Sequence, residues 1–210
     1  MVLVLPKDRD ERIFFLVGLM VFYGVIALIV HLLSDPVVLS VNGNEIQAGK
    51  ISVRELMDMG YNLSDEDAGV YLSEKERRVY EHVYDPASKV KGNTKVLNLI
   101  LVKGDEAHGS VTITNESSGE RSLEKCKVES ITLYKASLDA ESWMLNGIPM
   151  GEVTIERINE MCGEYKRQSD SGGWLQTTWR KSGYEITLYT IEEGTITRIS
   201  VTDRRLIVAF

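Results

Sequence analysis

The sequence predicts an α+β protein in which an N-terminal transmembrane helix precedes two related units, each a short helix packed on an antiparallel β-sheet. Three observations support this fold class. Residues 13–33 form an apolar run without Asp, Glu, Lys or Arg. Two stretches, 41–61 and 145–165, repeat the same order of residue types. Segments that alternate apolar and polar residues follow each stretch, as is typical of half-buried strands.

The apolar run 13–33 has the length and composition of a membrane-spanning helix. At 1.5 Å per residue a helix of this length extends about 31 Å, which matches a hydrocarbon core of about 30 Å. A cleaved signal peptide has a shorter apolar region and a small-residue cleavage site, whereas Ser34-Asp35-Pro36 follows this run. We therefore expect an uncleaved anchor, with residues 1–12 as a cytoplasmic tail.

The charges that flank this run predict its orientation. Lys7, Arg9 and Arg12 precede it, whereas residues 34–48 contain no Lys or Arg. The positive-inside rule then places the N-terminus in the cytoplasm. We expect a single-pass protein of the cell membrane whose C-terminal domain is extracytoplasmic.

The two similar stretches read VNGNEIQAGKISVRELMDMGY at 41–61 and LNGIPMGEVTIERINEMCGEY at 145–165. In each, an Asn-Gly pair indicates a tight turn after a short strand. A hydroxyl residue, Ser52 or Thr154, then precedes a short amphipathic pattern. The shared order of turn, hydroxyl and apolar residues indicates an internal duplication.

Each stretch also predicts where its helix begins and ends. Ser52 followed by Glu55 matches a capping box, in which both residues bind backbone N–H groups at the start of the helix. Gly60 and Gly163 follow the two apolar patterns, and glycine commonly ends a helix.

The segments after each helix predict two β-rich units, over 37–137 and 143–210. The expected strands are 96–103, 110–114 and 127–135 in the first unit, and 175–180, 184–191, 195–202 and a terminal 206–210 in the second. A hairpin connection is expected over 104–109, and the charged stretch 73–83 has helical spacing.

The second half contains NGIPMGEVTIERINEMCGEY and GYEITLYTIEEGTITRISV. These motifs resemble the helix-then-sheet repeats of the β-lactamase-inhibitor-protein-like and outer-membrane-assembly-lipoprotein (BamE/SmpA-like) group. The first half, with SVTITNESSGERSLEKCKVESI, is similar to uncharacterised membrane-anchored surface proteins of Gram-positive bacteria. This chain departs from the lipoprotein members because a helical anchor takes the place of a lipidated cysteine. Because proteins of this group mostly bind other proteins or assist envelope assembly, and few are enzymes, the resemblance implies protein binding or envelope assembly.

The sequence contains no motif for catalysis, cofactor binding or metal binding. Its three histidines, His31, His82 and His108, lack the spacing of a metal site, and no nucleophile motif is present. The acidic segment 65–67 favours a solvated loop, with weak cation binding as the alternative, since it lacks the calcium-loop pattern. A formal net charge of −7 disfavours nucleic acid. We expect a protein that is not an enzyme, with no cofactor and no nucleic-acid partner.

Two cysteines leave two alternatives open. Cys126 and Cys162 could form a disulfide between the halves in an oxidising compartment. Both lie within apolar patterns, which favours two separate buried thiols.

The candidate partner-binding residues are aromatic and basic residues of the second half: Trp143, Trp174, Trp179 and Arg180. Aromatic residues and Arg are enriched at protein interfaces, and aromatic residues equally suit a small core. The expected function is a membrane-anchored, extracytoplasmic, non-enzymatic domain for protein–protein interaction or envelope assembly. The alternative is an extracytoplasmic module that senses or binds a ligand or the cell wall.

Overall fold

The computed structural model describes residues 13, 15–25, 36–64, 84–104, 106–135, 143–171, 173–191 and 195–205. Its contacts divide the chain into two compact units, Met1–Asp35 and Pro36–Phe210. The predicted helix over 73–83 and the predicted terminal strand 206–210 lie outside the described residues.

In the first unit, residues 15–25 are helical. No helix within the described residues has both the length and the apolar composition needed to cross a membrane. On this finding the predicted transmembrane helix over 13–33 is wrong, and with it the single-pass, extracytoplasmic localisation; residues 14 and 26–33 of that run lie outside the described residues.

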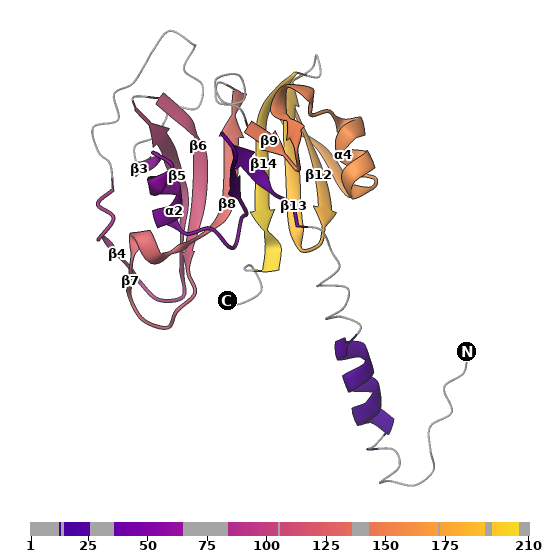
Figure 1. The fold of residues 1–210 in the computed structure, drawn as a ribbon. Helices are drawn as coiled ribbons and strands as arrows, with labels where there is room; N and C mark the ends of the chain where they lie inside the picture. The colour runs from indigo at the N-terminus through magenta and orange to yellow at the C-terminus, as the bar shows by residue number, and fades with distance from the viewer. Residues whose placement is uncertain are drawn as a thin grey trace. The chain divides into compact units, whose positions relative to one another are not determined.

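The second unit is built mainly of strands, and its largest element is an eight-stranded antiparallel sheet (Figure 1). The strand order is β11-β12-β13-β14-β8-β6-β5-β3. The bounds are β3 (Asn62–Ser64), β5 (Thr94–Lys103), β6 (Glu106–Asn115), β8 (Lys127–Tyr134), β11 (Arg167–Ser171), β12 (Trp174–Lys181), β13 (Tyr184–Ile191) and β14 (Ile196–Asp203).

Short strands form two smaller sheets. One has the order β10-β9-β1-β2, and the other pairs β4 with β7. Their bounds are β1 (Leu39–Val41), β2 (Asn44–Ile46), β4 (Lys89–Val90), β7 (Arg121–Ser122), β9 (Trp143–Leu145) and β10 (Ile148–Pro149). Two 3₁₀ turns, η1 (Leu123–Lys125) and η2 (Met150–Glu152), complete the described elements of this unit together with α2 and α4.

The two helices of this unit, α2 (Val53–Asp58) and α4 (Ile155–Cys162), begin where the hydroxyl residues predict. The predicted capping box is confirmed, since Ser52 Oγ accepts a hydrogen bond from the Glu55 N–H and the Glu55 carboxylate accepts one from the Ser52 N–H. Thr154 Oγ1 caps α4 by accepting a hydrogen bond from the Arg157 N–H, and Gly163 ends that helix. These hydrogen bonds satisfy backbone donors that the first helical turn leaves without a partner.

In both larger sheets, each half of the chain contributes one side of the sheet, and the two halves meet at the centre. The first half contributes β3, β5, β6 and β8, the second contributes β11 to β14, and β8 meets β14 at the centre. In the four-stranded sheet, β1 meets β9 at the centre.

The predicted α+β class, with one sheet in each of two units, is therefore wrong. Strands dominate the unit, and the two halves share both larger sheets. If the halves were separate, β8 and β14 would each be an exposed sheet edge, and their pairing removes both edges.

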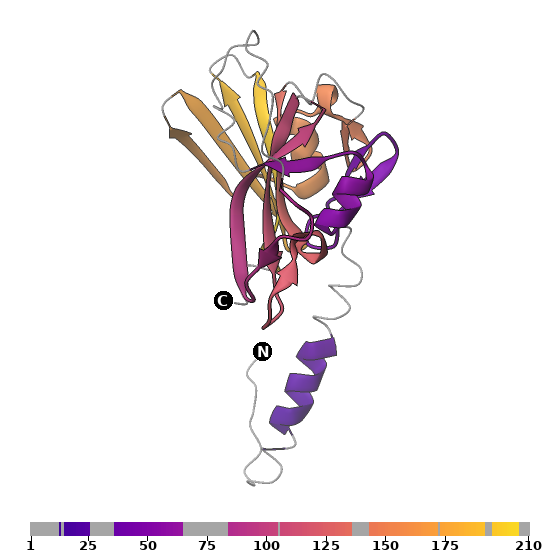
Figure 2. The same ribbon diagram turned by 90° about the vertical axis from the view of Figure 1, so that its left-hand side faces the viewer.

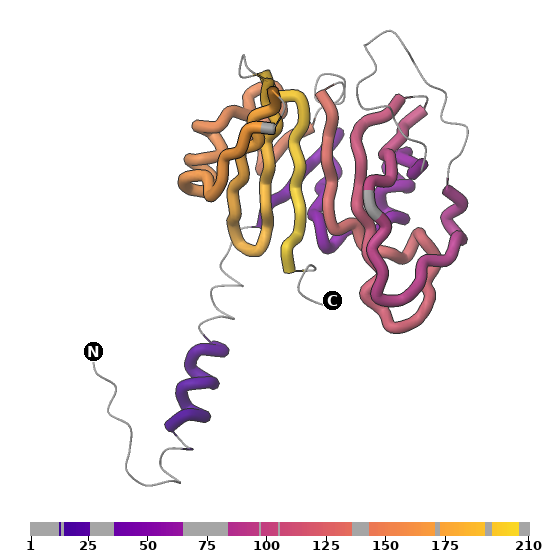
Figure 3. The backbone as a smooth tube through the Cα atoms, turned by 180° about the vertical axis from the view of Figure 1, so that it is seen from behind, coloured from indigo at the N-terminus to yellow at the C-terminus, as the bar shows by residue number. Residues whose placement is uncertain are grey.

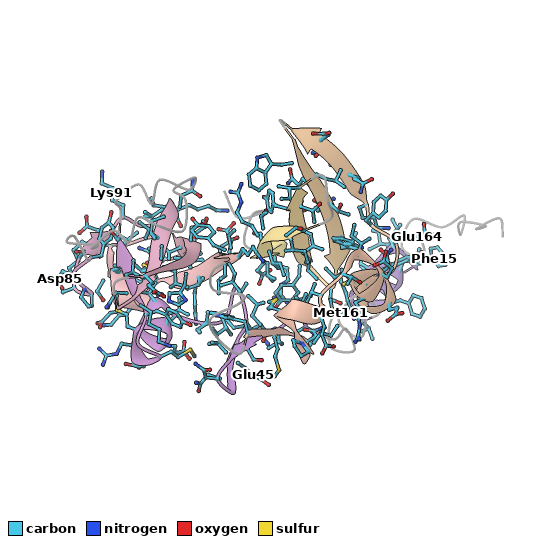
Figure 4. All side chains as sticks on the ribbon, turned by 90° about the horizontal axis from the view of Figure 1, so that it is seen from above. Phe15, Glu45, Asp85, Lys91, Met161 and Glu164 are labelled. Carbon is cyan, nitrogen blue, oxygen red and sulfur yellow. The ribbon has the colours of Figure 1, made fainter. Side chains whose placement is uncertain are left out.

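The hydrophobic core lies on one face of the large sheet. Alternate residues such as Ile131, Ile186 and Val201 are almost fully buried there. The helices α2 and α4 lie on this same side of the sheet (Figure 2). Seen from above, Glu45 on β2 and Met161 on α4 also lie on this side (Figure 4). Seen from behind, no other described helix or strand of the second unit covers the opposite face (Figure 3). We call it the open face.

Candidate functional site

The open face carries aromatic and basic side chains at its centre. Along β13, Tyr184, Ile186 and Leu188 are buried in the core. Because side chains alternate along a strand, Tyr189, which follows Leu188, points to the open face. In the antiparallel register, Tyr189 lies opposite Arg198 on β14.

Arg198 in turn lies opposite Tyr134 on β8. Trp174 on β12 shares the face, because it is one residue out of phase with Leu175 and pairs with Ile191. We call Trp174, Tyr189, Arg198 and Tyr134 the cation–aromatic row. All four side chains are half-buried.

The guanidinium of Arg198 is positioned by two aromatic rings. Its central carbon lies 5.0 Å from the centroid of the Trp174 ring and 5.1 Å from that of Tyr189. Such contacts attract the cation to the negative face of each ring. Within the described part of the chain, Arg198 forms no ion pair with a carboxylate. Its position is therefore fixed, and no described carboxylate pairs with its charge.

Short hydroxyl side chains surround the row on the same face. They bond to one another across strands, at 2.9 Å between Ser130 and Thr202 and at 3.0 Å between Thr132 and Ser200. Because these residues are short and mutually satisfied, the larger ring and guanidinium groups stand above them.

The structure separates the four predicted partner-binding residues between the two faces. Trp143 and Trp179 are 2% and 0% exposed, so they belong to the core and are not available to a partner. Trp179 Nε1 donates a hydrogen bond to Asn159 Oδ1 at 2.7 Å, which fixes α4 against β12. Trp174 lies in the cation–aromatic row, and Arg180 lies on the same open face.

Arg180 is already engaged by a carboxylate. Its Nε donates to Glu185 Oε2 at 3.1 Å, and Arg204 Nη1 donates to the same oxygen at 2.6 Å. Burial raises the pKa of Glu185, but the hydrogen bonds from Arg204 and Arg180 outweigh it and hold the pKa below its ordinary value. Glu185 is therefore ionised at neutral pH, and Arg180 shares this single negative charge with Arg204.

Sequence reasoning missed Arg198 as a site residue. The alternation of Arg198, Ser200 and Thr202 in the predicted strand 195–202 places the three on one face, so a signal was present. Its aromatic neighbours come from three other strands, and the pairing of β14 with β8 joins the two halves of the chain. That register is not visible in the local pattern.

The two cysteines are free thiols, so no disulfide joins the halves in this structure. Cys126 is buried and Cys162 is half-buried. Burial raises the pKa of both thiols, against a smaller opposing effect of Arg121 on Cys126 and of Lys181 on Cys162. Neither thiol is thus activated as a nucleophile.

No cluster of three or more His, Cys, Asp or Glu side chains suited to a metal is found among the described residues. His108 is buried in β6, where its ring meets Tyr61 edge-on at a centroid distance of 5.7 Å. His31, His82 and the acidic segment 65–67 lie outside the described residues.

Comparison with known proteins finds no matching protein-family model, no matching curated protein and no matching solved structure. The resemblance to the β-lactamase-inhibitor-protein-like and BamE/SmpA-like group stays a prediction.

Proposed function

We propose that the protein is a non-enzymatic protein-binding module whose cation–aromatic row receives a partner segment with a carboxylate between apolar side chains. One observation carries this proposal: Arg198 is held by the rings of Trp174 and Tyr189 without a carboxylate partner among the described residues. Trp, Tyr and Arg are the residue types that dominate the binding energy of protein interfaces.

The chemistry of Arg198 selects the partner group. A guanidinium presents planar N–H donors that match the two oxygens of a carboxylate. Stacking on Trp174 and Tyr189 limits its rotamers, so little conformational entropy remains to be lost on binding. The adjacent rings of Trp174, Tyr189 and Tyr134 offer apolar area for the residues that flank the carboxylate.

The net charge of the chain restricts the partner as a whole. At −7, the chain repels strongly acidic proteins at long range. The partner is therefore neutral or basic overall and carries its carboxylate locally, where Arg198 orients it.

The acid–base groups near the row favour binding over catalysis. Glu185, a carboxylate on the same face, is held ionised by Arg180 and Arg204. A carboxylate fixed in this state does not exchange protons near neutral pH, as a general acid or base must.

The test is selection of short displayed peptides on the full-length protein, followed by affinity measurements on synthetic copies of the selected sequences. Selected peptides are expected to contain Asp or Glu beside aromatic or aliphatic residues. Arg198→Ala is expected to weaken their binding by at least about tenfold. Arg198→Lys is expected to restore only part of the affinity, since an ammonium keeps the charge and loses the planar donors.

The matched control is Arg54→Ala on α2, which removes an exposed Arg that lies away from the open face. It should leave peptide affinity unchanged. Peptides that bind the Arg198→Ala protein as tightly as the unmodified protein would remove the row as the binding site.

A further inference from the structure

A cavity of about 530 Å³ lies on the other side of the large sheet, between the first turn of α4 and strands β12 to β14. Two hydrogen bonds place α4 there: Trp179 Nε1 to Asn159 Oδ1 at 2.7 Å and Lys181 Nζ to the Met161 carbonyl at 2.9 Å. Both act on the later turns of the helix. The first turn therefore stands over the sheet with space beneath it.

The floor of this cavity is apolar. Leu175, Leu188 and Ile196 line it from three adjacent strands, and Val153 and Ile155 line it from the start of α4. Its volume lies within the range of sites that hold a side chain or a small ligand.

The rim of the cavity is acidic. Glu156 and Asp170 both line it and are exposed, and no described Lys or Arg lines it. The pKa of Glu156 is lowered by a hydrogen bond from its own backbone N–H and by one from the Thr154 side chain. The rim therefore keeps negative charge at neutral pH and suits a cationic group.

Asp170 also belongs to β11, which forms one edge of the large sheet. Its outer side pairs with no strand that the structure describes. The matching edge at the other end differs, because the Tyr84 N–H donates to the Leu63 carbonyl of β3 at 2.8 Å. Among the described residues, a backbone hydrogen bond therefore reaches the outer side of β3, whereas none reaches the outer side of β11.

The register of β11 connects this edge with the cavity. Asp170 lies opposite Leu175, and Gln168 lies opposite Thr177, so alternate side chains of β11 face the cavity side. A strand added beside β11 would point alternate side chains the same way.

We propose that β11 accepts an extended segment of a partner protein as an additional strand. One apolar side chain of the segment enters the cavity, and a Lys or Arg two residues away faces Glu156 and Asp170. This site is independent of the cation–aromatic row, because it lies on the opposite face and selects the opposite charge.

The probe is a fluorescein-labelled peptide in which Lys and Leu alternate with Thr (Thr-Lys-Thr-Leu-Thr-Lys-Thr), titrated with the full-length protein and followed by anisotropy. The peptide is expected to bind, and its analogue with Glu in place of Lys to bind at least about tenfold more weakly. Equal binding of the two peptides, or no binding of either, overturns the proposal.

Two exposed substitutions identify the acidic rim. The double variant Glu156→Gln/Asp170→Asn is expected to bind the Lys peptide at least about tenfold more weakly. Arg198→Ala should leave the affinity for this peptide unchanged. Undiminished binding of the Lys peptide by the double variant overturns the proposal. Loss of binding with Arg198→Ala also overturns it, because that result assigns the peptide to the open face.

Backbone methylation tests strand addition. An added strand pairs along only one of its sides, so only every second N–H of the peptide bonds to β11. Two analogues are compared, N-methylated on one alternate set of residues or on the other. One analogue should lose binding and the other should keep it. Equal behaviour of the two analogues contradicts pairing along β11.

Discussion

Arg205 donates two hydrogen bonds to the buried carboxylate of Asp203, from Nε to Oδ1 at 2.8 Å and from Nη2 to Oδ2 at 2.6 Å. Asp203 ends β14 and is 2% exposed. Arg205 also donates to the Tyr184 hydroxyl at 2.6 Å, and Gln47 Nε2 donates to the same oxygen at 2.7 Å. The group thus connects the end of the second half with the turn before α2.

Removing the cation of this group should destabilise the fold. Arg205→Ala leaves the Asp203 carboxylate buried without its charge partner, which costs about 3 kcal/mol of unfolding free energy. Urea unfolding monitored by circular dichroism measures the loss. Arg54→Ala serves as the control, since its ion pairs with Asp58 and Glu124 leave it 62% exposed and contribute little. Equal stability of the two variants would contradict the structural role of Arg205.

Gly49 should not tolerate a side chain, because a Cβ at this position would overlap the Asp203 carboxylate. Its φ of +80° also disfavours any L-residue. Gly43 has nearly the same φ, +82°, but a Cβ there would meet open space. Gly43→Ala should therefore cost about 1 kcal/mol from backbone strain alone.

Gly49→Ala should cost about 1–3 kcal/mol more than Gly43→Ala, since it adds overpacking to the same strain. Denaturation midpoints of the two variants measure this difference. A difference near zero would show that Asp203 does not occupy the space beside Gly49.

The capping box of α2 should make stability depend on pH. The pKa of Glu55 is lowered from 4.5, first by the hydrogen bond from the Ser52 backbone and then by that from its side chain. A lowered carboxylate pKa stabilises the fold above the unfolded-state pKa, and this contribution is lost as the pH falls through the folded-state value.

The unmodified protein should therefore lose more stability than Glu55→Gln when the pH is lowered from neutral to about 3. Urea midpoints at the two pH values give the comparison. Ser52→Ala, which removes the hydroxyl cap, should lower stability at neutral pH by about 1 kcal/mol. Parallel pH profiles for the unmodified protein and Glu55→Gln would exclude the capping carboxylate as a source of acid sensitivity.

Both cysteines should react as thiols once the protein is unfolded. Alkylation in denaturant without a reductant is expected to add two labels, one at Cys126 and one at Cys162. In the native state Cys126 should be the slower, because it is buried whereas Cys162 is only half-buried. A mass without added labels would indicate the disulfide that this structure does not contain.

Local features of the second unit could be predicted from the sequence. The expected strands 175–180, 184–191 and 195–202 correspond to β12, β13 and β14 within about one residue at most ends. Alternation, turn residues and the hydroxyl caps at Ser52 and Thr154 suffice for such elements because the interactions involved are short-range. The hairpin expected over 104–109 is tighter, since β6 already begins at Glu106.

Features that depend on distant pairing could not be predicted in this way. Trp179 appears surface-exposed by its position next to Arg180 and Lys181, yet it is buried because α4 packs over its strand. Arg198 acquires its aromatic neighbours only through the registers of β12, β13 and β14. The single large sheet depends on β8 pairing with β14, and no local pattern encodes that choice.

The central pairing of β8 with β14 has a consequence for the order of folding. The pairing places Ile131 opposite Val201. The long loop between these two residues must therefore close before the sheet is continuous. During synthesis β8 emerges well before β14. Until β14 has emerged, the side of β8 that pairs with it has no partner strand. The sheet of the first half is therefore completed only when β14, the last described strand, has been synthesised and pairs with β8.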